Sequence, residues 1–135
     1  MKHVTPYLTF PGNAKEALDF YKEAFQVEIT NVQTFGDADF PTPEEMDDRI
    51  MHARLEKDGV LIMVSDAFLD QDVSAGNNIS LALEFENDRE IERVYSQLAE
   101  EGTVIMELQD TFWGARFAKV KDKFNIIWDL NLDKQ

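Results

Sequence analysis

Hydrophobic residues recur at helical spacing in two stretches of the chain. The first stretch holds Ala17, Phe20, Tyr21, Ala24 and Phe25. The second repeats the same spacings 74 positions later and holds Ile91, Val94, Tyr95, Leu98 and Ala99. This i, i+3, i+4, i+7, i+8 pattern predicts an amphipathic helix in each stretch, with one apolar stripe facing a core.

The residues that precede the two stripes repeat as well. Asn13 is followed three residues later by Glu16, and Asn87 is followed three residues later by Glu90. An Asn N-cap with an acid at the third helical position resembles a capping box, so we predict that each helix starts at its asparagine. Gly102 is predicted to end the second helix.

Alternating apolar residues predict one strand before each helix and three strands after it. Residues 3–10 place Val4, Pro6, Leu8 and Phe10 on one face, and residues 78–85 place Ile79, Leu81, Leu83 and Phe85 on one face. The later strands are predicted at residues 27–35, 50–57, 60–65, 104–111, 115–121 and 126–131, with turns at Asp58-Gly59 and Asp122-Lys123.

These elements form a βαβββ unit that occurs twice, which predicts an α+β fold. We expect a single domain over residues 1–135, with module one at about 3–65, a linker at about 66–77 and module two at about 78–131. The apolar face of each sheet must be covered. Two such sheets can curl around a common interior, so we expect a curved sheet around a cleft, with the helices outside.

The composition limits the chemistry and the partners. The chain has 13 Lys and Arg, 27 Asp and Glu, a net charge of −14 and no Cys, which excludes disulfides, thiol nucleophiles and Cys-bound metals. The charge argues against nucleic acid and anionic membranes as partners and favours neutral or cationic ligands. Residues 1–10 lack a signal-peptide pattern, and no apolar run reaches the roughly 20 residues of a membrane span, so we expect a cytoplasmic protein. The acid-rich residues 37–48 are expected to form a solvated loop.

Four segments resemble one known family. They are PYLTFPGNA at 6–14 with ALDFY at 17–21, MHA at 51–53 with LIMVSDA at 61–67, FWGAR at 112–116, and DKFNIIW at 122–128. In this order they resemble PhnB-like proteins of the vicinal oxygen chelate (glyoxalase/bleomycin resistance/dioxygenase) superfamily. The resemblance spans about residues 4–131 and implies the glyoxalase/bleomycin resistance-like fold and a homodimer. Asn125 stands where the family usually has Gly, and Asn tolerates the left-handed conformation of such a turn.

In metal-using members of the superfamily, two His and two acids come from the first and last strands of each half. By this resemblance the ligand positions fall on or near four sites, of which only the last holds an acid: Thr5, Met63, Ser80 (or Asn78), and Asp129. We therefore expect no metal and no cofactor. The alternative is an atypical metal site that uses Asp129 with His3 or His52, the only two histidines of the chain.

The leading hypothesis is a PhnB-like protein that binds a small organic molecule in an aromatic-lined cleft without the usual metal centre. The predicted cleft residues are Thr5, Tyr7, His52, Met63, Asn78, Ser80, Trp113 and Asp129. His52, on a strand face with Arg54 and Glu56, is interpreted either as a rim residue or as a ligand-contacting, proton-transferring group.

Two other functions remain open at this point. One is a metal-dependent lyase, isomerase or dioxygenase, so the question whether the chain is an enzyme stays open and no catalytic residue is assigned. The other is an interaction module whose cleft is filled by its own side chains. The glycines stand singly and form no Gly-rich cofactor loop, which counts against the methyltransferase label that some relatives carry.

Overall fold

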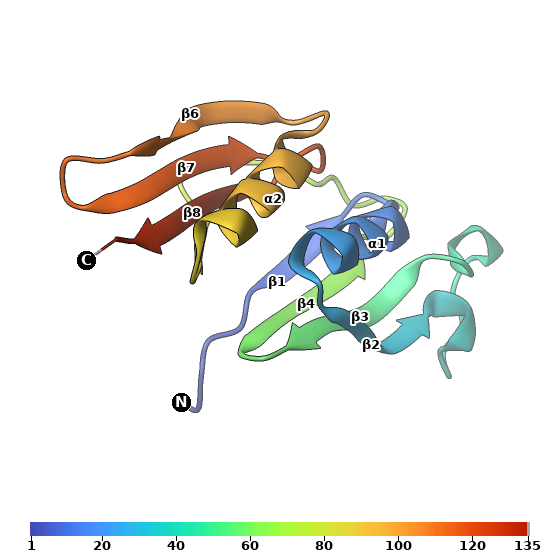
Figure 1. The fold of residues 1–135 in the computed structure, drawn as a ribbon. Coiled ribbons are helices and arrows are strands. Elements are labelled where there is room, and N and C mark those ends of the chain that lie inside the picture. Colours follow the sequence, from blue (N-terminus) through green and yellow to red (C-terminus); the bar gives the residue numbers. More distant parts are fainter. Residues whose placement is uncertain (135) are drawn as a thin grey trace. The chain divides into compact units, whose positions relative to one another are not determined.

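The computed structural model describes residues 1–134 of the chain. These residues fall into two compact units, residues 1–74 (unit one) and 75–134 (unit two). Each unit has its own four-stranded sheet and its own α-helix (Figure 1).

Unit one contains a βαβββ arrangement with two short 3-10 helices inserted after its second strand. Its elements are β1 (Tyr7–Phe10), α1 (Ala14–Phe25), β2 (Glu28–Thr34), η1 (Phe35–Asp37), η2 (Glu44–Met46), β3 (Ile50–Lys57) and β4 (Val60–Asp66). The strand order is β1-β4-β3-β2, with β1 parallel to β4 and the other pairs antiparallel.

Unit two repeats this topology. Its elements are β5 (Leu81–Glu84), α2 (Asp88–Ala99), β6 (Thr103–Asp110), β7 (Ala115–Lys121) and β8 (Ile127–Asp133). The strand order is β5-β8-β7-β6, again with the first strand parallel to the last and the others antiparallel. The predicted α+β class and the repeated βαβββ order are therefore confirmed.

The predicted apolar stripes form the cores of the two units. In α1, Ala17, Tyr21 and Ala24 are buried, and the Tyr21 ring stacks on Phe25 with centroids 5.6 Å apart. In α2 the buried residues of the stripe are Ile91, Val94 and Leu98. Each stripe packs on one face of its own sheet, where alternate strand residues are also buried: Ala53, Leu55, Ile62 and Val64 in unit one, and Ala118, Val120, Trp128 and Leu130 in unit two.

The other face of each sheet is covered by no helix of its own unit, and we call it the helix-free face. Because side chains alternate along a strand, it carries the residues between the buried ones. In unit one these include Tyr7, Thr9, His52, Arg54, Glu56, Met63 and Ser65. In unit two they include Ala82, Glu84, Phe117, Lys119, Asp129 and Asn131.

The first strand of each unit is shorter than its alternation pattern predicts. β1 begins at Tyr7 rather than at residue 3, because Pro6 has no N–H to continue the ladder and only its carbonyl accepts a bond, from Met63 N at 2.9 Å. β5 begins at Leu81 rather than at residue 78, because its parallel partner β8 begins only at Ile127. The predicted strand residues His3 and Asn78 therefore lie outside the strands.

The two helix starts differ, although their sequences repeat. The prediction for α2 is confirmed, since the Asn87 side chain accepts a hydrogen bond from Glu90 N at 2.8 Å. For α1 the predicted start at Asn13 is confirmed, but the side-chain cap is not: Asn13 makes no capping hydrogen bond, and its Oδ1 is buried without a partner. Instead, Ala14 N donates to Asp66 Oδ1 at 2.9 Å.

Asp66 is buried and joins three segments of unit one. Its Oδ1 accepts from Gly12 N and Ala14 N, and its Oδ2 accepts from Ile50 N at 2.9 Å. A carboxylate that accepts several backbone N–H groups is a strong, charge-assisted anchor. The carboxylate therefore fixes the start of α1 and the start of β3 to the end of β4.

Asp122 is the corresponding buried acid of unit two, at the turn between β7 and β8. Its Oδ1 accepts from Phe124 N and Ile126 N, and its Oδ2 accepts from the indole N–H of buried Trp128 at 2.8 Å. Asn125 in this turn has φ +71°, which confirms the left-handed conformation expected for it. The turn thus holds the largest core side chain in place.

Gly102 follows α2, but its role differs from the predicted cap. A Cβ at this position would lie 2.5 Å from the Lys121 carbonyl oxygen, and the positive φ belongs to the preceding residue, Glu101, at +59°. Glycine is required here because the backbone after α2 runs close to the end of β7.

The acid-rich segment after β2 is anchored by two buried apolar side chains. Phe35 and Met46 are buried, while the acidic residues between 37 and 48 are exposed, as the predicted solvated loop requires. Backbone bonds from Phe35 N to Arg49 O and from Gly36 N to Asp47 O close the loop on itself.

β6 lies at an edge of the sheet of unit two. Val104, Ile105 and Met106 are 39%, 51% and 41% exposed, and β7 is the one strand paired with β6 among residues 1–134. An edge strand of this kind presents apolar side chains and unpaired backbone groups.

Replacement of Asp66 tests its anchoring role. We expect Asp66→Asn to lower the free energy of unfolding by about 1–3 kcal/mol or more, because three backbone N–H groups, two of them buried, lose a charged acceptor. Asn13→Ala is the matched control and is expected to cost less, because Asn13 Oδ1 has no partner. Urea unfolding followed by circular dichroism measures both. A larger loss for Asn13→Ala than for Asp66→Asn would contradict this account.

A second prediction concerns the acid stability of unit two. Lys134 and Arg116 hydrogen-bond to Asp88 and lower the pKa of its carboxyl group below the ordinary value. A lowered folded pKa gives stability that is present above the unfolded pKa and is lost as pH falls through the folded pKa. We therefore expect Asp88→Asn to be less stable than the unchanged chain at pH 7, and the difference to disappear once the pH falls below the lowered pKa of Asp88. Thermal unfolding across this range measures the difference, and a gap that persists in acid would contradict it.

Candidate functional site

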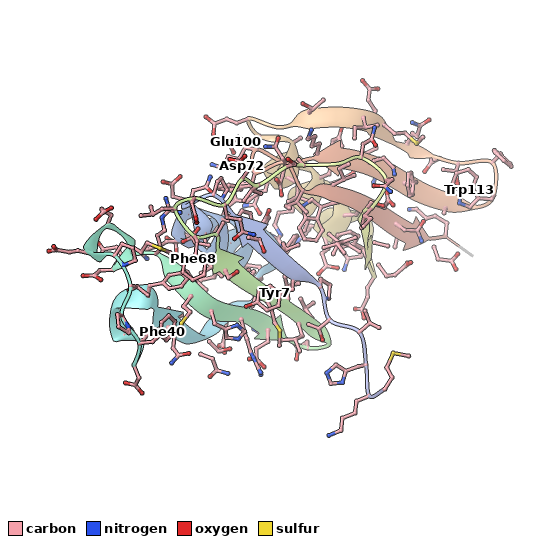
Figure 2. The ribbon with its side chains drawn as sticks, turned by 180° about the vertical axis from the view of Figure 1, so that it is seen from behind. Tyr7, Phe40, Phe68, Asp72, Glu100 and Trp113 are labelled. Carbon is pink, nitrogen blue, oxygen red and sulfur yellow. The ribbon has the colours of Figure 1, made fainter. Side chains whose placement is uncertain are left out.

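The helix-free face of unit one brings together an aromatic hydroxyl and an imidazole from different strands. Tyr7 lies on β1 (Figure 2) and His52 on β3, and the Tyr7 Oη lies 3.1 Å from His52 Nδ1. Their ring centroids are 5.8 Å apart. The pair spans β4, which separates the two strands in the sheet.

Either group can donate in this hydrogen bond. The Tyr7 hydroxyl donates when Nδ1 is unprotonated, and Nδ1–H donates to Tyr7 Oη when the imidazole is protonated or in the other tautomer. In the second case the Tyr7 hydroxyl proton is free to point at another acceptor. The pair can therefore present different donors to a bound molecule without breaking its own bond.

Met63 and Arg54 continue this site across the sheet. Tyr7 pairs with Met63, and Met63 pairs with Arg54, so the three side chains lie in one row on the helix-free face. Within residues 1–134, the Arg54 side chain makes no hydrogen bond or ion pair, and its Nε is buried without a partner. Glu56, two residues along β3, accepts a hydrogen bond from the Thr30 hydroxyl instead.

The helix-free face of unit two carries a polar network around Asp129. The Ser80 hydroxyl donates to Asp129 Oδ2 at 2.6 Å, and Lys119 Nζ lies 3.1 Å from Asp129 Oδ1. The Asp129 side chain is 20% exposed, and its strand neighbour on β5 is the small Ala82. The carboxylate thus has a cation and a hydroxyl as partners.

A second row of this face combines an amide, a carboxylate and an aromatic ring. Asn131 Nδ2 donates to Glu84 Oε2 at 2.9 Å, and Phe117 is the neighbour of Asn131 on β7. Trp113 lies in the turn between β6 and β7 (Figure 2), half exposed and 6.3 Å from the Phe117 ring. This row offers aromatic surface beside polar groups.

The structure brings some of the predicted site residues together within each unit. Tyr7, His52 and Met63 lie on one face of unit one, and Ser80 and Asp129 are hydrogen-bonded in unit two. Thr5 and Asn78 lie before the first strands of their units, and Trp113 lies in a turn.

Sequence reasoning did not assign Arg54 and Lys119 to the site. For Arg54 the signal was present, because it follows His52 by two residues on one strand and so shares its face. Lys119 was detectable only from the register that pairs it with Asp129.

No group of three or more His, Asp or Glu side chains that could hold a metal ion occurs among residues 1–134. His3, one member of the alternative metal site, is exposed and precedes β1. Lys119 Nζ occupies a position beside Asp129 Oδ1 where a metal cation would have to bind.

The two βαβββ units have the glyoxalase/bleomycin resistance-like fold. A glyoxalase/bleomycin resistance protein/dioxygenase family enzyme from Burkholderia phytofirmans PsJN has this fold at a TM-score of 0.65 and 15% identity, over 93% of this chain and 95% of its own. Within that class, the family model of 3-demethylubiquinone-9 3-methyltransferase matches residues 2–131, and the chain belongs to this family.

Individual relatives agree with this assignment. Protein YjdN of Escherichia coli K12 is 32% identical over 98% of this chain and 96% of its own length. The crystal structure of PA1353 from Pseudomonas aeruginosa has a TM-score of 0.90 and 32% identity over the whole of both chains. A Bacillus cereus PhnB protein, described as a putative 3-demethylubiquinone-9 3-methyltransferase, has a TM-score of 0.82 and 27% identity over 97% of this chain and 99% of its own. The PhnB-like resemblance is therefore confirmed.

Within the described part of the chain, no helix has the length and apolar character that a membrane crossing requires.

The hydrogen bond between Tyr7 and His52 can be tested by NMR. We expect Tyr7→Phe to shift the ¹⁵N resonances of the His52 ring, because Nδ1 loses its partner, and to change the free energy of unfolding by less than about 1 kcal/mol. His3 is the internal control, since it is exposed. Long-range ¹H–¹⁵N correlation spectra measure both rings. Unchanged His52 resonances in Tyr7→Phe would contradict the contact.

Proposed function

We propose that this chain binds a small organic molecule on the helix-free faces of its sheets, without a metal centre. The observation that carries the proposal is the Tyr7–His52 pair, a hydroxyl and an imidazole joined at 3.1 Å on a face that no helix of the unit covers. Pockets that bind small molecules combine apolar surface with a few such polar groups. Here Met63 adds the apolar surface beside the pair.

The proposed contact residues are those predicted from the sequence. Unit one contributes Thr5, Tyr7, His52 and Met63, and unit two contributes Asn78, Ser80, Trp113 and Asp129. That both sets line one cleft stays a prediction, as do the single domain, the homodimer and the cytoplasmic location. The proposal itself needs only the groups that each unit presents.

Metal-dependent lyase, isomerase or dioxygenase chemistry is the second candidate, and the environment of Asp129 argues against it. The carboxylate is engaged by Ser80 on one oxygen and lies beside the Lys119 ammonium on the other. A metal ion at Asp129 would have to displace Lys119 and would suffer its charge repulsion. We therefore place the binding function first and assign no catalytic residue.

The family description names a methyltransferase, and the residues present do not fit a nucleotide-type methyl donor. Such cofactors commonly bind at a Gly-rich turn that leads from a strand into a helix with free N–H groups. In unit one, Asp66 already occupies the N–H groups of Gly12 and Ala14 at this turn. In unit two the turn holds Glu86 and Asn87, and Asn87 caps its own helix. We propose no methyl-transfer step.

The methionine methyl groups offer a direct test. Of the five methionines, Met63 lies on the helix-free face of unit one, Met106 pairs with Lys119 in unit two, and Met46 is fully buried as an internal control. We expect small aromatic and heteroaromatic compounds to shift the ¹³C-methyl signals of Met63 or Met106 and to leave Met46 unchanged. Binding should persist after treatment with EDTA.

Two matched variants connect such binding to the site. His52→Gln should raise the dissociation constant about tenfold, as expected for the loss of a hydrogen bond to a ligand, whereas His3→Gln should not change it. A compound library that shifts neither Met63 nor Met106 would contradict the proposal. Binding that disappears with EDTA and returns with a divalent metal would favour the metal-dependent alternative.

A further inference from the structure

We propose that the molecule bound at unit one carries an oxyanionic group, a carboxylate or phosphoryl group, and that Arg54 holds it together with His52 and Tyr7. This inference rests on the proposed binding function and specifies its ligand class. The charge of the whole chain favours neutral or cationic ligands, so the local arrangement leads to a different expectation.

The guanidinium group of Arg54 lacks the hydrogen-bond acceptor or acid that a partly buried arginine normally has. Within residues 1–134 it makes no hydrogen bond or ion pair, although the chain contains 27 acids. Its Nε is buried, and a buried donor without an acceptor is unfavourable because it has lost its hydrogen bonds to water. Buried unsatisfied groups are rare in native proteins and are often explained by a role in binding.

Other arginines of the chain show what a structural partner looks like. Arg116 pairs with Asp88 and Glu92, each at 2.9 Å, and Arg49 donates to the Ala67 carbonyl oxygen at 2.9 Å. Arg54 has acids near it in the register, since Glu56 shares its strand face and pairs with Glu28. The Glu56 carboxylate accepts the Thr30 hydroxyl, however, and does not neutralise Arg54.

The row across the sheet places the necessary groups within reach of one ligand. Tyr7, Met63 and Arg54 are successive neighbours on β1, β4 and β3, so the outer two backbones are about 10 Å apart. His52 lies two residues from Arg54 on the same face, about 7 Å away along β3. Long side chains from both ends can meet over Met63.

These groups match the chemistry of an oxyanion. A guanidinium presents a planar fork of N–H donors that binds two oxygens of a carboxylate or phosphoryl group together. The Tyr7 hydroxyl can donate to the same group when His52 Nδ1–H donates to Tyr7 Oη. Met63 beneath them offers a flexible apolar surface for the organic part of the molecule.

The negative charge of the chain does not exclude this ligand. At physiological ionic strength, charges beyond about 8 Å are largely screened. The groups next to the ligand therefore decide whether an anion or a cation is preferred. On the helix-free face of unit one, Arg54 is the one Lys or Arg among the strand residues, with Glu56 and Glu28 one row away. A monoanion with a single carboxylate therefore fits better than a molecule with many charges.

Three probes with the same ring and different charge test this inference: benzoate, benzamide and benzylammonium. We expect benzoate to shift the Met63 methyl signal and the Arg54 Nε–Hε signal, and to bind at least about tenfold more tightly than benzamide, as for a charge-assisted hydrogen bond. Benzylammonium should bind more weakly than benzoate.

The variants are Arg54→Gln, and Arg89→Gln as its control, because Arg89 is an exposed residue of α2 and the change in net charge is the same. Arg54→Gln should weaken the binding of benzoate about tenfold and leave the binding of benzamide unchanged. Arg89→Gln should change the binding of neither probe. The Met46 methyl signal reports whether each variant is folded.

The outcomes separate this inference from the proposed function. Benzamide or benzylammonium that shifts Met63 as strongly as benzoate, or benzoate binding that survives Arg54→Gln unchanged, overturns the oxyanion assignment and leaves small-molecule binding in place. Absence of a Met63 shift with all three probes overturns the oxyanion assignment, while the library screen on Met63 and Met106 decides the binding function on its own.

Discussion

A buried carboxylate at the end of β4 is the contact on which the architecture of unit one depends. Asp66 receives N–H groups from residues 54, 52 and 16 positions away in the sequence, and so joins the turn after β1, the start of α1 and the start of β3. These bonds add to the parallel pairing of Tyr7–Phe10 with β4 and to the burial of Phe10 in the core. Asp66 thus helps to hold the ends of β1 and β3, the two strands that carry Tyr7 and His52, in place. Asp122 fixes the turn and Trp128 in unit two by the same means.

Local patterns predicted the elements well, because the forces that form them act within a few residues. The helical stripes, the cap at Asn87 and the left-handed Asn125 all follow from contacts inside one helix or one turn. Patterns failed where a distant segment decides the outcome. Asn13 has the same sequence signal as Asn87, but Asp66 from another strand supplies the cap. The alternating pattern before α2 extends back to residue 78, but β8, the partner of β5, begins too late to pair with residues 78 and 79.

The candidate site shows the same limit. Alternation along the strands indicates which residues share a face. This was sufficient to assign Tyr7, His52, Ser80 and Asp129 to the helix-free faces of their units. The state of each charged group depends instead on its cross-strand neighbours. Lys119 meets Asp129 because the register of β7 on β8 pairs them. Glu56 shares the strand face of Arg54, but its carboxylate accepts the Thr30 hydroxyl and makes no ion pair with Arg54. The family assignment establishes the fold and leaves the ligand to these details, because one fold hosts many unrelated functions.

The exposed edge at β6 gives the surplus of acidic residues a further meaning. Val104, Ile105 and Met106 form an apolar strand edge of the kind that can pair with the same strand of another molecule. At neutral pH a net charge of −14 keeps molecules apart, whereas near the isoelectric point of about 4.4 this repulsion disappears and the edge remains. Charge repulsion thus opposes association of two molecules through the exposed edge strand. It sets the lower pH at which the protein can be concentrated, independently of how firmly either unit is folded.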